Sequence, residues 1–396
     1  LADRNHIAYA ATQAPAKLTV RESVLARRRA IPETQWQFTP ERTAIEMAAG
    51  FQPGLIYELV YTGENPRLQG AGLAAVRDTA AFFKYTKDGV TLLGDQPRWI
   101  KRALAFGISQ SGRFLRTFLY YGMNEDEHGR KVFDGVWADV AGGGRGSFNH
   151  RFAQASRDGY AHMNTLYQTD LFPFADVPHP LPEGDGSDGL LINIRDSVMP
   201  KIFYTNGSCE YWNRCASLVH TSLAGAVDMP LGRMTRMYFV AGSQHGPNAL
   251  PRKVKGARYD SSPNETRPLH RALLDALHAW VKDGVEPPRS KFPTIADEDL
   301  VPMGKVKWTK AGRAALPEFP KQGYDVDYGE DFVSKGIVTV EPPKVKGRFA
   351  VLLPQVDADG NDLGGVRMPV VAAPLGAFTG WNMRAEGTGE IGRAHV

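Results

Sequence analysis

The sequence predicts an α/β fold: a mostly parallel central sheet flanked by helices, with a lid-like insertion and a C-terminal extension. Three observations lead to this fold class. An apolar run at 103–106 leads through a serine turn into the helical stretch 113–120. Further strand-like runs at 201–205 and 237–241 each end in a turn of small or polar residues, and the stretch 268–282 has the apolar spacing of a helix. Strands separated by helical stretches are typical of a parallel sheet.

The turn after the first of these strands is Gly-Ile-Ser-Gln-Ser-Gly, residues 107–112. A serine exposed on a sharp strand-to-helix turn needs small neighbours two residues away on each side. Gly107 and Ser111 meet this need around Ser109, whereas a nucleophile at Ser111 would have the bulky Arg113 two positions later. We therefore predict Ser109 as a nucleophile, with serine in place of the last glycine of the G-x-S-x-G pattern.

A serine hydroxyl needs a base within hydrogen-bond reach and a carboxylate that orients the base. Strand 201–205 is followed by a short turn and Glu210, and strand 237–241 is followed by the loop that contains His245. Residues just past the carboxyl ends of parallel strands meet at one edge of the sheet. Ser109, Glu210 and His245 are therefore predicted to form a triad, in the chain order found in α/β-hydrolases.

Other residues compete for two of these roles. Asp139 closes the strand-like run 135–140 and is the alternative acid, while Glu210 could instead act only on the dipole of a helix that begins beside it. His150 is the alternative base, although no clear strand leads to it.

Three runs of sequence carry a resemblance to a known family. They are Gly-Ile-Ser-Gln-Ser-Gly-Arg-Phe-Leu-Arg (107–116), Val-Ala-Gly-Gly-Gly-Arg-Gly-Ser-Phe-Asn-His-Arg-Phe (140–152) and Ala-Gly-Ser-Gln-His-Gly-Pro (241–247). Together they make most of the chain resemble a large bacterial group of proteins with the α/β-hydrolase fold. The resemblance implies a serine esterase-like site with Ser109, His245 and Glu210 as nucleophile, base and acid.

An oxyanion hole should use the backbone N–H of Gln110, which follows the nucleophile, and one N–H from a loop after an earlier strand. We assign that strand to 56–61, so the second donor is Thr62 or Gly63, although the loop could simply turn the chain toward a helix at 73–85. Four aromatic residues are candidates for an apolar substrate pocket: Tyr211, Trp212, Phe172 and Phe174.

The predicted function is hydrolysis of a small-molecule carboxylic ester through an acyl-enzyme, with no cofactor and no metal. An acyltransferase would use the same acyl-enzyme, and a non-catalytic binding protein could use the same fold. The two cysteines, Cys209 and Cys215, read as free thiols, and no Cys/His spacing typical of a metal site accompanies them.

Composition is that of a globular enzyme. Of the 396 residues 42% are hydrophobic and 23% are charged, and no apolar run is long enough to span a bilayer. The net charge of +4 comes from scattered basic residues without a nucleic-acid motif, which gives no support to a nucleic-acid partner.

We expect a catalytic domain at 1–290 that carries the lid-like insertion at about 152–197, and an extension at 291–389 that wraps it. The extension is rich in proline, with strand-like pieces at 336–340 and 349–353 and a turn at 357–362. The chain begins without methionine, which suggests a missing leading segment, and 390–396 reads as a non-native tail.

Overall fold

The computed structural model describes residues 10–23, 26–65, 71–85, 100–146, 148, 170–246, 248–308, 316–317, 320–340 and 343–383. Its centre is a four-stranded sheet in the order β11-β10-β7-β6, in which every pair of neighbours is parallel. The strands are β6 (Leu104–Ile108), β7 (Gly135–Asp139), β10 (Lys201–Gly207) and β11 (Thr235–Val240). This arrangement confirms the predicted parallel sheet, and each predicted strand of the sheet agrees with the observed one within a few residues.

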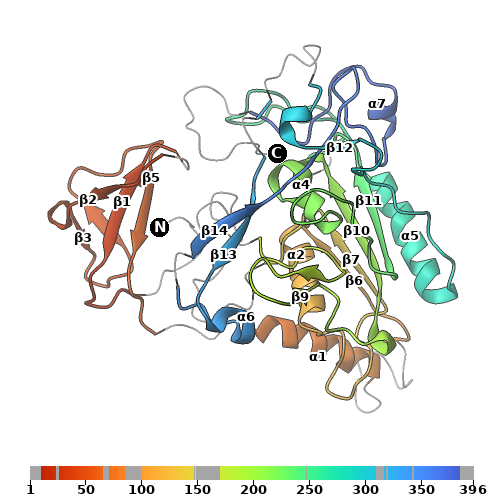
Figure 1. The fold of residues 1–396 in the computed structure, drawn as a ribbon, viewed down its shortest axis with the longest axis horizontal. Helices are drawn as coiled ribbons and strands as arrows, with labels where there is room; N and C mark the ends of the chain where they lie inside the picture. The colour runs from red at the N-terminus through yellow and green to blue at the C-terminus, as the bar shows by residue number, and fades with distance from the viewer. Residues whose placement is uncertain are drawn as a thin grey trace.

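Helices cover both faces of the sheet (Figure 1). Successive residues of a strand point to opposite faces, so β10 places Tyr204 in the apolar cluster with α2 (Gln110–Tyr120) and Phe203 in the cluster with α5 (Arg267–Asp283). α5 has a proline in its first turn and ends before Gly284, whose φ is +72°. These start and stop signals explain why the predicted helix at 268–282 forms here.

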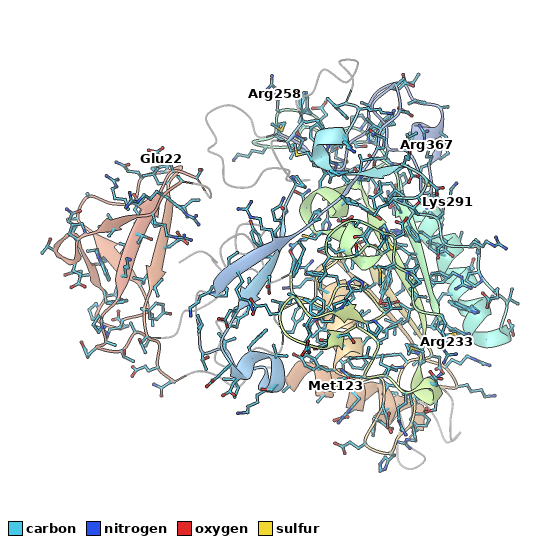
Figure 2. All side chains as sticks on the ribbon, in the orientation of Figure 1. Glu22, Met123, Arg233, Arg258, Lys291 and Arg367 are labelled. Atoms are coloured by element: carbon cyan, nitrogen blue, oxygen red, sulfur yellow. The ribbon has the colours of Figure 1, made fainter. Side chains whose placement is uncertain are left out.

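The region after α5 completes the open edge of β11. Lys291 forms a parallel bridge with Tyr238, and Val366 forms a parallel bridge with Val240 (Lys291 and Arg367 are labelled in Figure 2). These bridges cover polar backbone groups that an edge strand would otherwise leave open. The elements of this region are β12 (Leu300–Val301), η5 (Met303–Lys305), β13 (Gly323–Asp327), α6 (Asp331–Lys335), β14 (Lys344–Phe349), β15 (Leu353–Pro354) and α7 (Pro369–Ala372).

Two strand predictions in this region are wrong. The stretch 349–353 is not a strand, because β14 ends at Phe349 and β15 begins at Leu353. The stretch 336–340 is no strand, because Gly336 ends α6 with φ +65°, a left-handed conformation that breaks extended structure. The antiparallel pair is formed by β13 and β14 instead.

Only the second half of the predicted lid lies in the described residues, and it is built into the body. It contains β8 (His179–Pro180), β9 (Ser187–Asp188) and η3 (Asp196–Val198). Phe174 and Leu190 are completely buried, and the Asp176 carboxylate accepts hydrogen bonds from the hydroxyls of Tyr204 (2.8 Å) and Thr235 (2.6 Å). The first part of the predicted lid, 152–169, lies outside the described residues.

The N-terminal strands form a three-stranded sheet of their own and a separate strand pair. β1 (Lys17–Arg21) pairs antiparallel with both β2 (Arg29–Ile31) and β5 (Ile56–Val60), while β3 (Trp36–Phe38) pairs with β4 (Ile45–Met47) after η1 (Glu33–Gln35). Figure 1 shows this sheet at one side of the body, with α1 (Ala71–Tyr85) following it along the base. The domain boundaries proposed from the sequence stay a prediction.

Across the described ranges, every helix is too short or too polar to serve as a membrane span.

Candidate active site

Ser109 lies at the sharp turn between β6 and α2, as the strand, turn and helix pattern predicts. Its backbone has φ 57° and ψ −113°, outside the regions that non-glycine residues prefer. Its N–H donates to the carbonyl of Asp139 at the end of β7, with 2.8 Å between the atoms. A strained serine held by the neighbouring strand is the geometry of a nucleophile elbow.

The tight positions around this turn are two glycines. A Cβ at Gly107 would lie 2.5 Å from the carbonyl oxygen of Ser111, and one at Gly112 would lie 3.0 Å from the Ala141 side chain and from the Asp139 carbonyl. Ser111, by contrast, is exposed. The spacing around Ser109 indicates Gly107 but not Gly112, which is constrained both by residues at the end of β7 and by the carbonyl oxygen of Gly107, 3.0 Å from the position of a Cβ.

The predicted base and acid contact each other and the serine. His245 Nε2 lies 2.7 Å from Ser109 Oγ, and His245 Nδ1 lies 2.7 Å from Glu210 Oε1. His245 follows β11 on a loop, and its side chain is 36% exposed. The three side chains thus come together from the carboxyl ends of β6, β10 and β11, where the parallel topology predicts a site.

Glu210 is fixed in place by the start of α4 (Ser208–Asn213). Its side chain is fully buried, and its second oxygen, Oε2, accepts the N–H of Gly207 at 2.7 Å. A Cβ at Gly207 would collide with the Ser243 hydroxyl, at 2.0 Å. The Gly-x-x-Glu spacing at a helix start, in which the third helical residue reaches back to the cap N–H, could have indicated this contact from sequence.

The alternative acid, Asp139, is buried near the triad but contacts other residues. Its carboxylate accepts a hydrogen bond from the Thr205 hydroxyl and lies 3.5 Å from His270 Nε2 on α5. Burial raises the pKa of this carboxyl, while His270 and Thr205 lower it. The carboxylate in contact with His245 is therefore Glu210, and the alternative base His150 lies outside the described residues.

Of the oxyanion donors predicted from sequence, Gln110 lies where a donor is expected, whereas Thr62 and Gly63 do not follow a strand of the central sheet. Gln110 is the first residue of α2, where backbone N–H groups have no acceptor within the helix. Thr62 and Gly63 follow β5, which belongs to the N-terminal sheet and not to the sheet of β6. Their backbones contact Thr12 and Ala11, so assigning them through β5 is wrong.

A comparison with protein-family models identifies the family of the chain. A family model described as an alpha/beta hydrolase domain matches residues 32–394. The chain belongs to the α/β-hydrolases. No curated protein and no solved structure matches it.

The aromatic residues predicted to line a pocket of this α/β-hydrolase are mostly core residues. Tyr211 and Phe174 are completely buried, and Trp212 is 4% exposed and packs against Trp381. The Tyr211 hydroxyl lies 2.8 Å from His220 Nε2. Phe172, partly buried, packs beside Phe174. Side chains enclosed in this way do not fit a role in lining a substrate pocket.

The thiols of this α/β-hydrolase are both free and buried, and burial raises the pKa of Cys209 and of Cys215. In the part of the chain that the structure describes, the potential metal ligands that cluster are Cys209, Glu210 and His245. Because the last two already hydrogen-bond each other, we assign the cluster to the triad.

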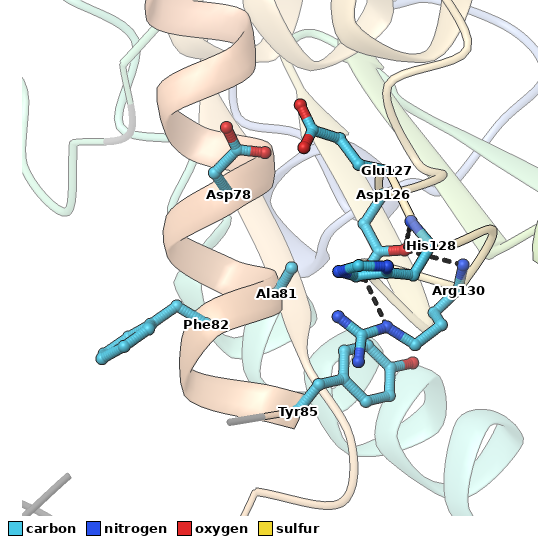
Figure 3. A pocket seen from close by; sticks show the side chains of 8 residues that line it. All are labelled: Asp78, Ala81, Phe82, Tyr85, Asp126, Glu127, His128 and Arg130. Atoms are coloured by element: carbon cyan, nitrogen blue, oxygen red, sulfur yellow. Dashed lines mark hydrogen bonds and ion pairs between the residues drawn. The ribbon is translucent and has the colours of Figure 1, made fainter. Parts of the chain in front are cut away.

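A hollow between α1 and the turn 126–130 is separate from this site (Figure 3). That turn precedes β7 and thus lies at the amino ends of the parallel strands, whereas Ser109 lies at their carboxyl ends. Its Arg130 Nε donates to Asp126 Oδ2 at 2.7 Å, so these charges satisfy each other. The hollow therefore takes no part in the candidate active site.

Proposed function

We propose that this α/β-hydrolase is a serine hydrolase that cleaves carboxylic esters through an acyl-enzyme, with Ser109 as nucleophile, His245 as base and Glu210 as acid. One observation carries the proposal: an unbroken chain of two 2.7 Å contacts joins the serine oxygen, both nitrogens of the imidazole ring and a buried carboxylate. Such a chain meets the distance requirement for general-base activation of a hydroxyl.

In the acylation step, Ser109 Oγ attacks the ester carbonyl while its proton passes to His245 Nε2. Glu210 Oε1 accepts the hydrogen bond from Nδ1–H, which selects the tautomer with a free Nε2 and stabilises the imidazolium that forms. The N–H of Gln110 donates to the oxyanion of the tetrahedral intermediate. His245 then protonates the leaving alkoxide, and the alcohol departs.

In the deacylation step, His245 removes a proton from a water molecule, which attacks the acyl carbon. The second tetrahedral intermediate collapses, the Ser109 oxygen takes its proton back from His245, and the acid product leaves. An alcohol that replaced this water would give acyl transfer through the same intermediate, so the acceptor decides between hydrolysis and transfer.

A panel of p-nitrophenyl esters graded by acyl length, with lactones and aryl esters beside it, tests the proposal. We expect hydrolysis by the wild type and a loss of roughly 10⁵- to 10⁶-fold in kcat for Ser109→Ala. Ser111→Ala is the matched control, since that serine is exposed two residues away, and it should retain activity. Full activity in Ser109→Ala, or no hydrolysis of any ester by the wild type, would contradict the proposal.

Adding a competing alcohol to the same assay identifies the acceptor. Free acid as the product supports hydrolysis, whereas a new ester in proportion to the alcohol would make acyl transfer the reaction.

A further inference from the structure

The turn at 357–361 places a carboxylate beside the candidate active site. Asp357 Oδ1 accepts the backbone N–H groups of Asp359 and Asn361, each at 3.0 Å, so the turn closes on its own side chain. The next residue, Asp362, is only 4% exposed, whereas Asp359 in the same turn is exposed. The sequence predicts a turn at 357–362 but not that the carboxylate of Asp362 is buried.

The Asp362 carboxylate contacts the segment that leads to the proposed base. Its Oδ2 accepts the N–H of Gly242, at 2.8 Å, three residues before His245. This bond is buried, and it holds the loop at the point where β11 ends.

We propose that Asp362 is a positioning residue of the proposed active site, whose carboxylate anchors the loop of His245 through the N–H of Gly242 and so sets where the base lies. This inference rests on the proposed function. The bond of Asp362 goes to the backbone of this loop, so Asp362 acts through the loop that it holds.

Neighbouring contacts connect the anchored loop to the segment of the proposed acid. The N–H of Cys209, in α4, donates to the carbonyl of Ser243, in the loop, at 3.2 Å. The C-terminal region also packs here, because a Cβ at Gly380 would lie 2.1 Å from the Cys209 nitrogen. The N–H of Ala241, just before the loop, donates to the carbonyl of Val366 at 3.0 Å. A shift of the loop after loss of the Asp362 carboxylate would therefore also reach the segment of Glu210.

Charged groups around Asp362 come from two elements. Arg367, labelled in Figure 2, lowers the pKa of Asp362 and Asp357 raises it, and these two pair with each other through a 2.6 Å contact. On α4, burial raises the pKa of the Tyr211 phenol, and the charges of Asp299 and Asp362 raise it further. Burial outweighs the favourable contacts and raises the pKa of Asp362 to about 6.

Because the pKa of Asp362 is raised, its ionisation is expected to affect the stability of the fold and the position of the loop in opposite directions. A carboxyl whose pKa is higher in the folded protein than in the unfolded chain favours folding when protonated, and this stabilisation is lost as the pH rises through about 6. At neutral pH the fold thus holds an ionised carboxylate that opposes its stability, beside the loop that leads to the proposed base. Ionisation strengthens the hydrogen bond from Gly242, because an anionic acceptor binds an N–H more strongly than a neutral one does.

Three variants test the role: Asp362→Ala, Asp362→Asn and, as the matched control from the same turn, the exposed Asp359→Asn. We expect Asp362→Ala to lower kcat by roughly 10- to 100-fold with KM changed by less than about threefold, because a small displacement of a catalytic group slows chemistry more than binding. Asp362→Asn should restore most of this loss at pH 8, since its amide oxygen can still accept from Gly242. Asp359→Asn should match the wild type.

The pH dependence of the Asp362→Asn variant relative to the wild type is the readout that a purely structural role would not move. At pH 8 the wild type, with an ionised Asp362, should exceed Asp362→Asn in kcat/KM, because an anionic acceptor binds the Gly242 N–H more strongly than a neutral one does. This ratio should fall toward one as the pH falls through about 6, where Asp362 becomes a neutral acceptor like asparagine. Asp362→Asn therefore keeps the proposal testable even if Asp362→Ala does not fold.

Titrating active sites with a fluorophosphonate corrects every rate for the amount of folded enzyme. If kcat per labelled site is unchanged in Asp362→Ala, or if the ratio of kcat/KM between the wild type and Asp362→Asn does not change with pH, Asp362 is not a positioning residue. Failure of the proposed function looks different, because the wild type itself would then neither hydrolyse esters nor take up the label.

Discussion

The ends of β10 and β7 each present a buried carboxylate with a histidine partner, yet only one pair has the geometry of a catalytic dyad. Glu210 lies 2.7 Å from His245, while Asp139 lies 3.5 Å from His270. The second ring nitrogen of His245 contacts Ser109, whereas the His270 ring packs edge-on against Trp137, 5.6 Å between centroids. His245 is on a loop at the carboxyl edge of the sheet, and His270 is on the helix that covers one face.

The two pairs show that proximity of a carboxylate and an imidazole does not by itself define an active site. The other nitrogen must face a nucleophile, and the backbone must fix the carboxylate. Glu210 meets the second condition, because its carboxylate accepts the backbone N–H of Gly207. Asp139 is held by a side chain instead, the Thr205 hydroxyl. The two pairs also interact, because Glu210 raises and His245 lowers the pKa of Asp139. Substitutions in one pair can therefore be compared with matched ones in the other.

The largest difference is expected between the two histidines. His245→Gln should lower kcat/KM by roughly 10⁵- to 10⁶-fold, because the base is lost, while His270→Gln should stay within about tenfold of the wild type. Steady-state hydrolysis of an activated ester measures both, with thermal unfolding as a check on folding. Similar losses in the two variants would remove the distinction drawn between the pairs.

The two carboxylates should differ next most. Glu210→Gln leaves the imidazole without an anionic partner and should lower kcat by about 10⁴-fold. Asp139→Asn keeps a group that can accept from Thr205, and we expect a change of less than about tenfold. A greater loss of kcat in Asp139→Asn than in Glu210→Gln would identify Asp139 as the catalytic acid.

A third substitution acts on stability and leaves the triad intact. The Thr205 hydroxyl accepts from Trp137 Nε1 at 2.8 Å and donates to Asp139, so Thr205→Val leaves two buried polar groups without this partner. The free energy of unfolding should fall by about 1–3 kcal/mol, and Thr205→Ser should recover most of it. Chemical denaturation measures the change. If Thr205→Val is as stable as Thr205→Ser, the hydroxyl contributes nothing to the Asp139 pair.

These comparisons also show what the sequence can predict. Strand ends fix where Ser109, Glu210 and His245 meet, because parallel strands bring their carboxyl ends to one edge, and this much follows from apolar runs and turns. The partner of a strand does not follow from its own residues, so the run 56–61 does not reveal that β5 pairs with β1, apart from the sheet of β6.

Burial by segments that are distant in the sequence cannot be predicted from local residues either. Phe174 and Tyr211 look like pocket residues in sequence, but core clusters that include Phe349 and Phe239 enclose them. The role proposed for Asp362 depends on its hydrogen bond with the N–H of Gly242, 120 positions earlier, and no local sequence pattern predicts that contact.

The smallest expected effect is a pH dependence of stability. Burial raises the pKa of Asp139 above its unfolded value, so protonated Asp139 favours the fold, and this contribution is lost as the pH rises through the folded pKa. Relative to Asp139→Asn, the wild type should therefore lose stability as the pH rises from about 4 toward neutrality, by on the order of 1–3 °C in Tm. Scanning calorimetry of both proteins across this range measures it. Parallel curves would show that Asp139 does not titrate differently in the folded protein.

The central claim is that Ser109 is the nucleophile activated by the His245–Glu210 pair. Mass spectrometry of the peptide that contains Ser109 and Ser111, after reaction with a fluorophosphonate, tests it most directly. We predict an adduct on Ser109 that forms in the wild type and is strongly slowed in His245→Gln. An adduct on Ser111, or none in a preparation that hydrolyses esters, would contradict the account.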